Sequence, residues 1–501
     1  MVRIPLAVRS ASRWPRGSIA LGLGALPLAL HLGCSPIGSS PHGSGGAVGS
    51  GGIGPLGTGG AGTSGGSAGA GGSVGAVLPY AEQALPGYTL IGSPENDASA
   101  AFDAFLVDMD GNVVHTWPIT GFPPKLLPAG SLIGCHGVFP GSYDCVAMEQ
   151  RSWDGELEWS FSDFAMTAQL SAARHHHDFQ REGSPTGYYA PGLLPLASGK
   201  TLVLALEDRT LPELHDGIIE EDVIYEVGAA GELLRVLWKA SEHVDEIGFD
   251  AAALADIMTQ PEEPLELLHG NSLMLVGDNP WRAQGHPEFA PQNLVYSSRR
   301  ANFVAIISAQ TGEIVWKIGP DFAGKPEAVL GQFVGQHFAH IVPAGLPGAG
   351  NMLVLDNGGG SGYGGPLSDP HGFRYTRNYS RVIEFNPITF EVVWEYGEPA
   401  GPTTFFTQFL GAAQRLPNGN TLLTIGGEGR VIEVTPDKEI VWQYQYESSG
   451  SGTQAWVYRA IRFPPEWLPN GESALRSRYP SWSGLYEGGP AAGGAGTGGS
   501  Q

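Results

Sequence analysis

Residues 308–316 read SAQTGEIVW, a polar turn with one glycine, followed by apolar residues that end on a tryptophan. A Thr-Gly or Asp-Gly pair supplies the positive φ that a tight hairpin turn needs, and the residues after it fit a strand with one buried face. The stretch therefore predicts a β-hairpin with a two-residue turn, whose second strand carries the tryptophan.

A similar phrase, in which the turn often contains a glycine, occurs six times along the chain. The copies end at Trp117, Trp159, Trp238, Trp316, Trp394 and Trp442. Successive tryptophans are 42, 79, 78, 78 and 48 residues apart. Repeated short strands favour four-stranded blades arranged in a ring, because a ring leaves few sheet edges exposed. We expect an all-β fold, a six-bladed β-propeller.

The two ends of the folded region predict how the ring closes. The first hairpin, at 105–117, has no strand pair directly before it, and WVYRAIRF at 456–463 is a strand pattern with no tryptophan hairpin after it. We therefore expect the N- and C-terminal strands to complete one blade together and close the ring.

Residues 1–34 have the pattern of an export signal. Basic residues from Arg3 to Arg16 precede an apolar run at 19–32, which ends at Leu32-Gly33-Cys34. This end resembles a lipobox, in which Cys34 would be the lipidated residue, and plain cleavage by a general signal peptidase is the alternative. We expect an exported protein of the periplasm or cell envelope, tethered to the outer membrane as a lipoprotein.

Composition divides the rest of the chain. Residues 35–80 contain no Asp, Glu, Lys or Arg and are rich in Gly and Ser, which is typical of a flexible linker. We expect the propeller to span 81–485 and a Gly-rich tail to span 486–501. The formal charge of −23 becomes −27 when the four arginines of the signal are removed (−23 − 4). Such a charge argues against nucleic acid or anionic membrane surfaces as partners, so we expect membrane contact only through the lipid anchor. No oligomeric state follows from the sequence.

The chain has three cysteines. With Cys34 taken by lipid, Cys135 and Cys145 remain, ten positions apart. They could form a disulfide in an oxidising compartment or remain thiols, and their spacing excludes a CxxC motif.

Polar residues interrupt the strand pattern at four places. The interruptions are RHHHDF at 174–179, LHGNS at 268–272, GQHFAH at 335–340, and Tyr458-Arg459. The first three lie at the start of a blade, just before its inner strands, so we expect their side chains to approach the central channel. Such clusters could ligate a metal, satisfy buried backbone groups between blades, or donate hydrogen bonds to a tetrahedral oxyanion. Because no HExxH is present and Arg299 would oppose a cation, we expect no metal.

Several phrases resemble those of bacterial arylsulfate sulfotransferases. They are HHDF (176–179), LLHGNS (267–272), LVYSSRRANFVAII…TGEIVWKIG (294–319), GQH (335–337), LVLDNG (353–358), YSRVIEFNP (379–387), GAAQRLPNGNTLLT (411–424) and VYRA (457–460). The resemblance covers roughly residues 85–465, and the order of the phrases is more specific than any one of them. It implies a six-bladed propeller in the periplasm that moves a sulfuryl group between phenols without a nucleotide sulfate donor.

The resemblance also implies roles for single residues. His337 is similar to the nucleophilic histidine of the family, which is sulfated on nitrogen. His269, Asn271 and Arg299 match residues that hold the sulfuryl oxygens, and His177 matches a further active-site histidine. The remaining expected substrate contacts are His176, Phe338, Tyr458 and Arg459. Phe338 stands where the family often has a polar or acidic residue, which could alter the choice of donor.

The sequence thus predicts a ping-pong sulfotransferase that takes a sulfuryl group from an aryl sulfate and passes it to a phenolic acceptor, with no cofactor. Two alternatives use the same residues or the same scaffold. One is an aryl sulfate hydrolase that passes the group to water. The other is a lipid-anchored propeller that binds a ligand or a surface partner without chemistry.

Overall fold

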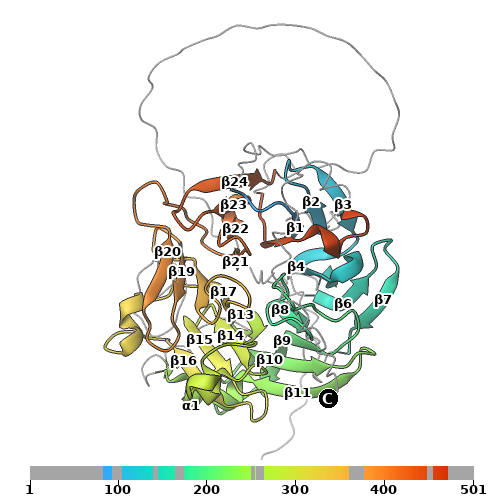
Figure 1. Ribbon diagram of the computed structural model, residues 1–501. Coiled ribbons are helices and arrows are strands. Elements are labelled where there is room, and N and C mark those ends of the chain that lie inside the picture. Colours follow the sequence, from blue (N-terminus) through green and yellow to red (C-terminus); the bar gives the residue numbers. More distant parts are fainter. Residues whose placement is uncertain are drawn as a thin grey trace, which may run out of the picture.

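The computed structural model is a six-bladed β-propeller (Figure 1). The structure describes residues 83–92, 104–138, 145–163, 174–249, 254–255, 264–359, 377–447 and 455–471. The expected signal peptide, Cys34, the linker and the tail lie outside these residues. In the described part of the chain, no helix is long and apolar enough to cross a membrane.

Each blade is an antiparallel sheet of four strands. Blade one contains β25 (Arg459–Phe463), β1 (Tyr88–Gly92), β2 (Ala104–Val107) and β3 (Val113–Trp117). Blade two contains β4 (Thr120–Leu126), β5 (Leu132–Val138), β6 (Cys145–Arg151) and β7 (Leu157–Phe161). Blade three contains β8 (Arg174–Arg181), β9 (Thr201–Thr210), β10 (Ile218–Val227) and β11 (Leu233–Lys239).

The second half of the ring repeats this order. Blade four contains β13 (Gly270–Leu275), β14 (Leu294–Ser298), β15 (Phe303–Ile307) and β16 (Ile314–Ile318). Blade five contains β17 (His337–Ile341), β18 (Met352–Asp356), β19 (Arg381–Phe385) and β20 (Val392–Tyr396). Blade six contains β21 (Ala412–Arg415), β22 (Thr421–Ile425), β23 (Arg430–Val434) and β24 (Ile440–Gln445). In the chain, a short helix, α1 (Val244–Ile247), and a two-residue strand, β12 (Leu265–Glu266), follow blade three, and β12 pairs in parallel with β10.

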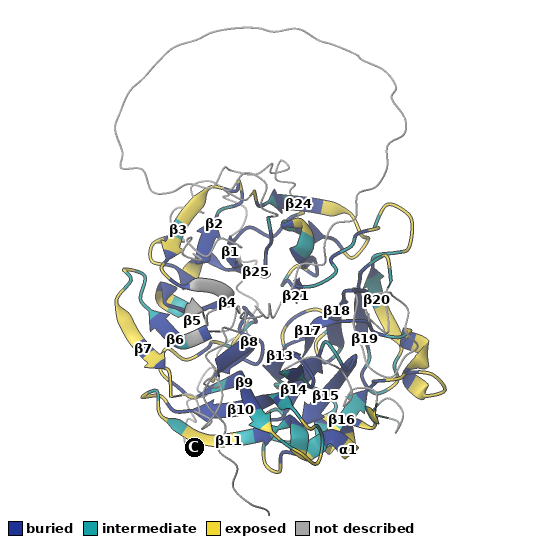
Figure 2. Ribbon diagram, turned by 180° about the vertical axis from the view of Figure 1, so that it is seen from behind, coloured by how far each residue is buried: buried dark blue, intermediate teal, exposed yellow. Residues whose placement is uncertain are grey.

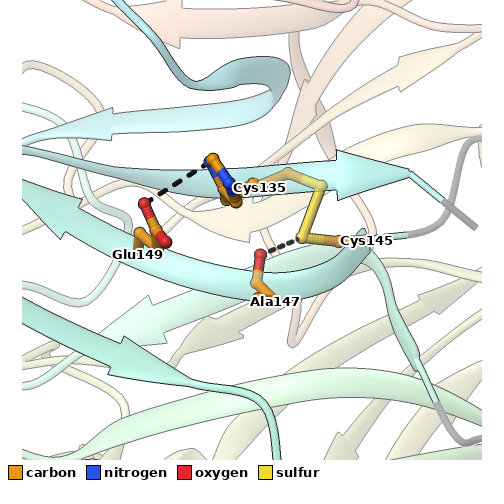
Figure 3. The surroundings of a disulfide bond; sticks show 5 residues. Cys135, Cys145, Ala147 and Glu149 are labelled. Atoms are coloured by element: carbon orange, nitrogen blue, oxygen red, sulfur yellow. Dashed lines mark hydrogen bonds and ion pairs between the residues drawn. A yellow bond between two sulfur atoms is a disulfide. The ribbon is translucent and has the colours of Figure 1, made fainter.

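The ring closes as the sequence predicts. The C-terminal strand β25 pairs antiparallel with β1 from Tyr88↔Phe463 to Gly92↔Arg459. Blades two and three also touch through one pair, Cys145↔His175, between β6 and β8. The disulfide Cys135–Cys145 joins β5 to β6 beside this seam, with Cα atoms 5.3 Å apart (Figure 3).

The tryptophan hairpins form the outer strands of all six blades, at the rim of the ring (Figure 1). The turn is longer than the expected two residues. In β2–β3 the pair Asp108–Asn112 encloses three residues, and in β15–β16 the pair Ser308–Glu313 encloses four. Each hairpin has a register shift beside its turn, which absorbs the extra residues. The glycine does supply the positive φ, as at Gly111 (80°) and Gly312 (80°).

The repeated tryptophan packs each blade against the next. Trp442 of blade six donates from Nε1 to the carbonyl of Met109 in the outer turn of blade one, at 2.8 Å. Trp394 of blade five donates in the same way to Pro436 of blade six, at 2.9 Å. In Figure 2 the inner strands are buried and the outermost strands carry the exposed residues. The apolar core therefore lies between the blades, and the inner strands face the centre of the ring.

Candidate active site

Three consecutive inner strands break their regular pairing where the polar clusters lie. The register shifts fall between His175 and Phe179 in β8, between Gly270 and Ser272 in β13, and between His337 and His340 in β17. His177 and His269 have φ values of 59° and 54°. Left-handed backbone is costly for residues other than glycine and often marks functional sites. The bulges bring side chains of three blades together. The clusters thus lie in or directly before the innermost strands, as the sequence predicts.

His337 is the first residue of β17, and only 2% of its surface is exposed. Its Nδ1 lies 2.9 Å from the carbonyl of Gly335 and 2.8 Å from Oδ1 of Asn357. The amide of Asn357 donates to the carbonyls of Thr407 and Leu410, at 2.9 Å each, so Oδ1 is the atom that faces the histidine. Two acceptors at Nδ1 require a proton there, and neutral His337 then carries its lone pair on Nε2.

The surroundings of His337 keep it neutral. Burial, together with the positive charge of Arg299, lowers its pKa to about 3, although the hydrogen bond to Asn357 acts in the opposite direction. Among the described residues, Nε2 of His337 has no hydrogen-bond partner. A neutral imidazole with an uncommitted lone pair is a nucleophile.

His177 and His269 form a second imidazole pair beside His337. Their Nε2 atoms are 2.8 Å apart, and the ring centroids of His177 and His337 are 6.2 Å apart. Nδ1 of His177 lies 2.8 Å from the hydroxyl of Tyr458, and Nδ1 of His269 bonds Glu266. Burial lowers the pKa of His269 to about 4 and that of His177 well below its usual value. Both rings are therefore neutral near pH 7.

Arg299 supplies the positive charge of the site. It directly follows β14, and its backbone N–H donates to the carbonyl of His269 at 3.0 Å. Its charge contributes to the lowered pKa of His177, His269 and His337, after burial. A guanidinium that acts on all three rings is suited to an anionic ligand between them.

Asn271 joins two blades at the site. Its side chain is buried, and its amide donates to the carbonyl of Gln336, directly before His337, at 2.7 Å. The neighbouring Gly270 donates its N–H to Asp222 at 2.5 Å, and a Cβ there would lie 2.6 Å from the same oxygen. The small residue in His-Gly-Asn thus permits this close approach. Asn271 thus bonds the residue directly before His337, and its expected contact with sulfuryl oxygens stays a prediction.

Arg459 and Phe338 pack against each other. The guanidinium of Arg459 lies 4.2 Å from the ring centroid of Phe338 and 3.2 Å from Oδ1 of Asp178. Lys125 bonds the same carboxylate at 2.9 Å. Burial alone would raise the pKa of Asp178, but Arg459 and Lys125 outweigh it and hold the pKa below its usual value. This ion cluster fixes β25 and β4 against β8, and the expected contacts of Arg459 and Phe338 with substrate stay predictions.

His176, His177 and His269 have ligand nitrogens within 4.8 Å of one another, which is the spacing of a metal site. Nε2 of His177 and Nε2 of His269 are, however, already hydrogen bonded to each other. A metal ion would have to replace that bond. The expectation that the site works without a metal stays a prediction.

Two residues of the site were not identified from the sequence. Asn357 orients His337, and its signal was its place in the LVLDNG phrase. Glu266 bonds His269 from a position three residues earlier, in LELLHGN. A carboxylate this close to an expected active-site histidine was a usable signal. Trp456 forms a small apolar cluster with Leu410 and Tyr458.

Comparison with known proteins gives the following matches. A protein of unknown function from Bacteroides caccae is 12% identical with a TM-score of 0.38, over 75% of this chain and 99% of that chain. A streptogramin B lyase is 11% identical with a TM-score of 0.34, over 75% of this chain and 88% of that chain. A virginiamycin B lyase from Staphylococcus aureus is 9% identical with a TM-score of 0.33, over 75% of this chain and 89% of that chain. No match was found among curated proteins.

The family comparison covers the half of the chain that contains most of the site. Residues 199–447 match the family model described as arylsulfotransferase (ASST). This range includes His269, Asn271, Arg299, His337 and Asn357. The propeller fold and this match agree with the resemblance seen in the sequence. The chain belongs to the arylsulfotransferase family.

Proposed function

We propose that the protein transfers a sulfuryl group from an aryl sulfate to a phenol by a ping-pong mechanism through a sulfated His337. Membership of the arylsulfotransferase family supports sulfuryl transfer in general. The observation that carries the finer proposal is the fixed proton on Nδ1 of His337, which leaves Nε2 as a neutral nucleophile.

In the first half-reaction, the Nε2 lone pair attacks the sulfur atom of the aryl sulfate. The N–S bond forms while the bond between sulfur and the aryl oxygen breaks, and the phenolate leaves and takes up a proton. The sulfuryl oxygens carry negative charge throughout, which Arg299 stabilises. As in phosphoryl transfer, most of the catalysis is positioning and charge stabilisation.

In the second half-reaction, a phenol enters the same site and its oxygen attacks the sulfur atom. The O–S bond forms, the N–S bond breaks, and the lone pair returns to Nε2 of His337. The phenol loses its proton to a base of the site. One site therefore serves both half-reactions, which is the condition for ping-pong kinetics.

The test uses nitrophenyl sulfate as donor, with and without added phenol. Transfer predicts release of nitrophenol that depends on the acceptor, and a sulfuryl adduct on His337 in protein quenched at alkaline pH. His337→Ala should keep the fold and lose both. Release that does not depend on the acceptor would favour a hydrolase instead, and no release with several aryl sulfates would favour a binding protein. An adduct on another residue would overturn the assignment of His337.

We also propose that the protein is exported and held in the cell envelope by a lipid on Cys34. The disulfide between Cys135 and Cys145 supports an oxidising compartment. Replacement of Cys34 by Ala should release the protein from the membrane fraction. Retention of the variant there would count against the lipid anchor.

A further inference from the structure

Four side chains form a continuous line of hydrogen bonds next to His337. Tyr458 directly precedes β25, His177 lies in β8, His269 directly precedes β13, and Glu266 lies in β12. The hydroxyl of Tyr458 is 2.8 Å from Nδ1 of His177, whose Nε2 is 2.8 Å from Nε2 of His269. Nδ1 of His269 bonds the carboxylate of Glu266.

The direction of each bond follows from the last member. An ionised carboxylate only accepts, so Nδ1 of His269 carries the proton and its Nε2 carries the lone pair. This lone pair accepts from Nε2–H of His177, whose Nδ1 then accepts from the hydroxyl of Tyr458. The line thus runs from a phenolic hydroxyl to a carboxylate through two neutral rings.

Glu266 is held in its ionised form. Burial would raise its pKa, but His269 and the guanidinium of Arg300, at 3.1 Å, outweigh this and lower the pKa well below its usual range. Arg299 acts in the same direction. His176 faces His269 with ring centroids 4.8 Å apart. The side chain of Glu266 is 17% exposed, so the protein supplies most of its surroundings.

We propose that Tyr458, His177, His269 and Glu266 form a proton relay that removes the proton of the incoming phenol. The proposal rests on the sulfuryl transfer proposed above. The phenol gives its proton to the oxygen of Tyr458, the Tyr458 proton moves to Nδ1 of His177, and the Nε2 proton of His177 moves to Nε2 of His269. Tyr458 and His177 regain their proton count, and His269 becomes an imidazolium paired with Glu266.

Glu266 is a positioning residue in this relay. It fixes the tautomer of His269 and stabilises the positive charge that arrives there, as a carboxylate does behind a catalytic histidine. A second contact of the Tyr458 hydroxyl supports the relay, because the hydroxyl also lies 3.0 Å from the backbone carbonyl of His177. Once Nδ1 of His177 has taken the first proton, Tyr458 can donate the proton that replaces it to this carbonyl.

The decisive variant is Glu266→Gln, which keeps the shape and removes the charge. The measurement compares acceptors of different acidity, with nitrophenyl sulfate as donor. A phenol that is already ionised at the assay pH needs no base, whereas a weakly acidic phenol does. We expect turnover with the weak acid to fall about a hundredfold, and turnover with the acidic phenol to stay near that of the parent. The initial burst of nitrophenol should remain, because nitrophenolate leaves without protonation.

Glu288→Gln is the matched control. Glu288 bonds His286 at 3.1 Å in the same kind of pair, away from the site, so the change should leave all acceptors unaffected. An equal loss with both acceptors in Glu266→Gln, or no loss with either, overturns the relay. If the parent shows neither burst nor acceptor dependence, the proposed function itself fails.

Tyr458→Phe provides the second test and is the deciding one if Glu266→Gln does not fold. It removes the first hydroxyl of the line without burying a charge. We expect the same selective loss with weakly acidic phenols. Tyr444→Phe, at a buried tyrosine of blade six that packs on Trp442, is its control. Full activity of Tyr458→Phe with weakly acidic phenols would contradict the relay.

Discussion

Oδ1 of Asn357 lies 2.8 Å from Nδ1 of His337 and fixes which nitrogen of this imidazole carries the proton. The asparagine cannot turn its amide over without losing its two bonds to backbone carbonyls. The reactive lone pair is therefore set by a residue that need not touch the substrate.

Asn357→Asp should change both the pH profile and the stability. A carboxylate next to His337 favours the imidazolium and raises its pKa from about 3. The acid limb of the kcat/KM profile should then move upward into pH 4–7, a range in which kcat/KM of the parent should not change with pH. Two buried carbonyls also lose their donor, which costs about 1–3 kcal/mol each. Asn293→Asp, at a buried asparagine away from the site, should lose stability without moving the limb. An unchanged limb in Asn357→Asp would refute the role of Asn357.

Arg299→Lys should be severe although the charge is kept. A lysine is a point charge and does not offer the planar fork that spans two sulfuryl oxygens. We expect a loss of about 2–4 kcal/mol in transition-state stabilisation, by analogy with the removal of one oxyanion donor. The measurement is steady-state kinetics of Arg299→Lys beside those of Arg282→Lys, a control at an exposed arginine. Turnover near that of the parent would mean that Arg299 has a structural role.

The buried histidines should make the protein less stable in mild acid. Burial lowers the pKa of His340 and of His269 to about 4, against 6.5 for the ordinary side chain. Below pH 6.5 the unfolded chain takes up protons that the folded chain does not, so the free energy of unfolding falls until about pH 4. Melting temperatures at pH 7 and pH 5 test this. The melting temperature of His340→Gln should fall less from pH 7 to pH 5 than that of the parent. An equal fall in both proteins would show that His340 does not contribute to the acid sensitivity.

Activity should survive chelators and need no sulfated nucleotide. Nitrogen and guanidinium groups do the chemistry proposed here. Metal analysis of the purified protein, with an assay after exhaustive chelation, provides the check. Stoichiometric zinc whose removal stops turnover would overturn the mechanism, whereas a loss of stability alone would indicate a structural ion.

The number and order of the blades could be predicted because a tryptophan of the outer strand recurs in each blade. A tryptophan of the outer strand contacts the outer turn of the next blade, as Trp394 and Trp442 do, and such a contact needs the same phrase every time. The lengths of the turns could not be predicted. A bulge beside each turn takes up one residue, and the alternation of apolar residues does not reveal it.

The polar clusters and their place on the inner strands were also predictable, since strands and turns do not need those residues. Their partners were not. Asn357 reaches His337 across blade five, and Glu266 reaches His269 from a strand of two residues. The positive φ of His177 and His269 has no sequence signal either, because glycine is the usual residue for that backbone.

The strand that closes the ring also brings Tyr458 to His177, 281 positions away in the sequence. Tyr458 is held there by its backbone, whose N–H donates to the carbonyl of Gly92 in β1 at 2.7 Å. The site is thus completed by nearly the last part of the fold that a ribosome would release. A chain cut short before this strand lacks Tyr458, and with it the first member of the proposed relay. Under that proposal, turnover with weakly acidic phenols depends on closure of the ring.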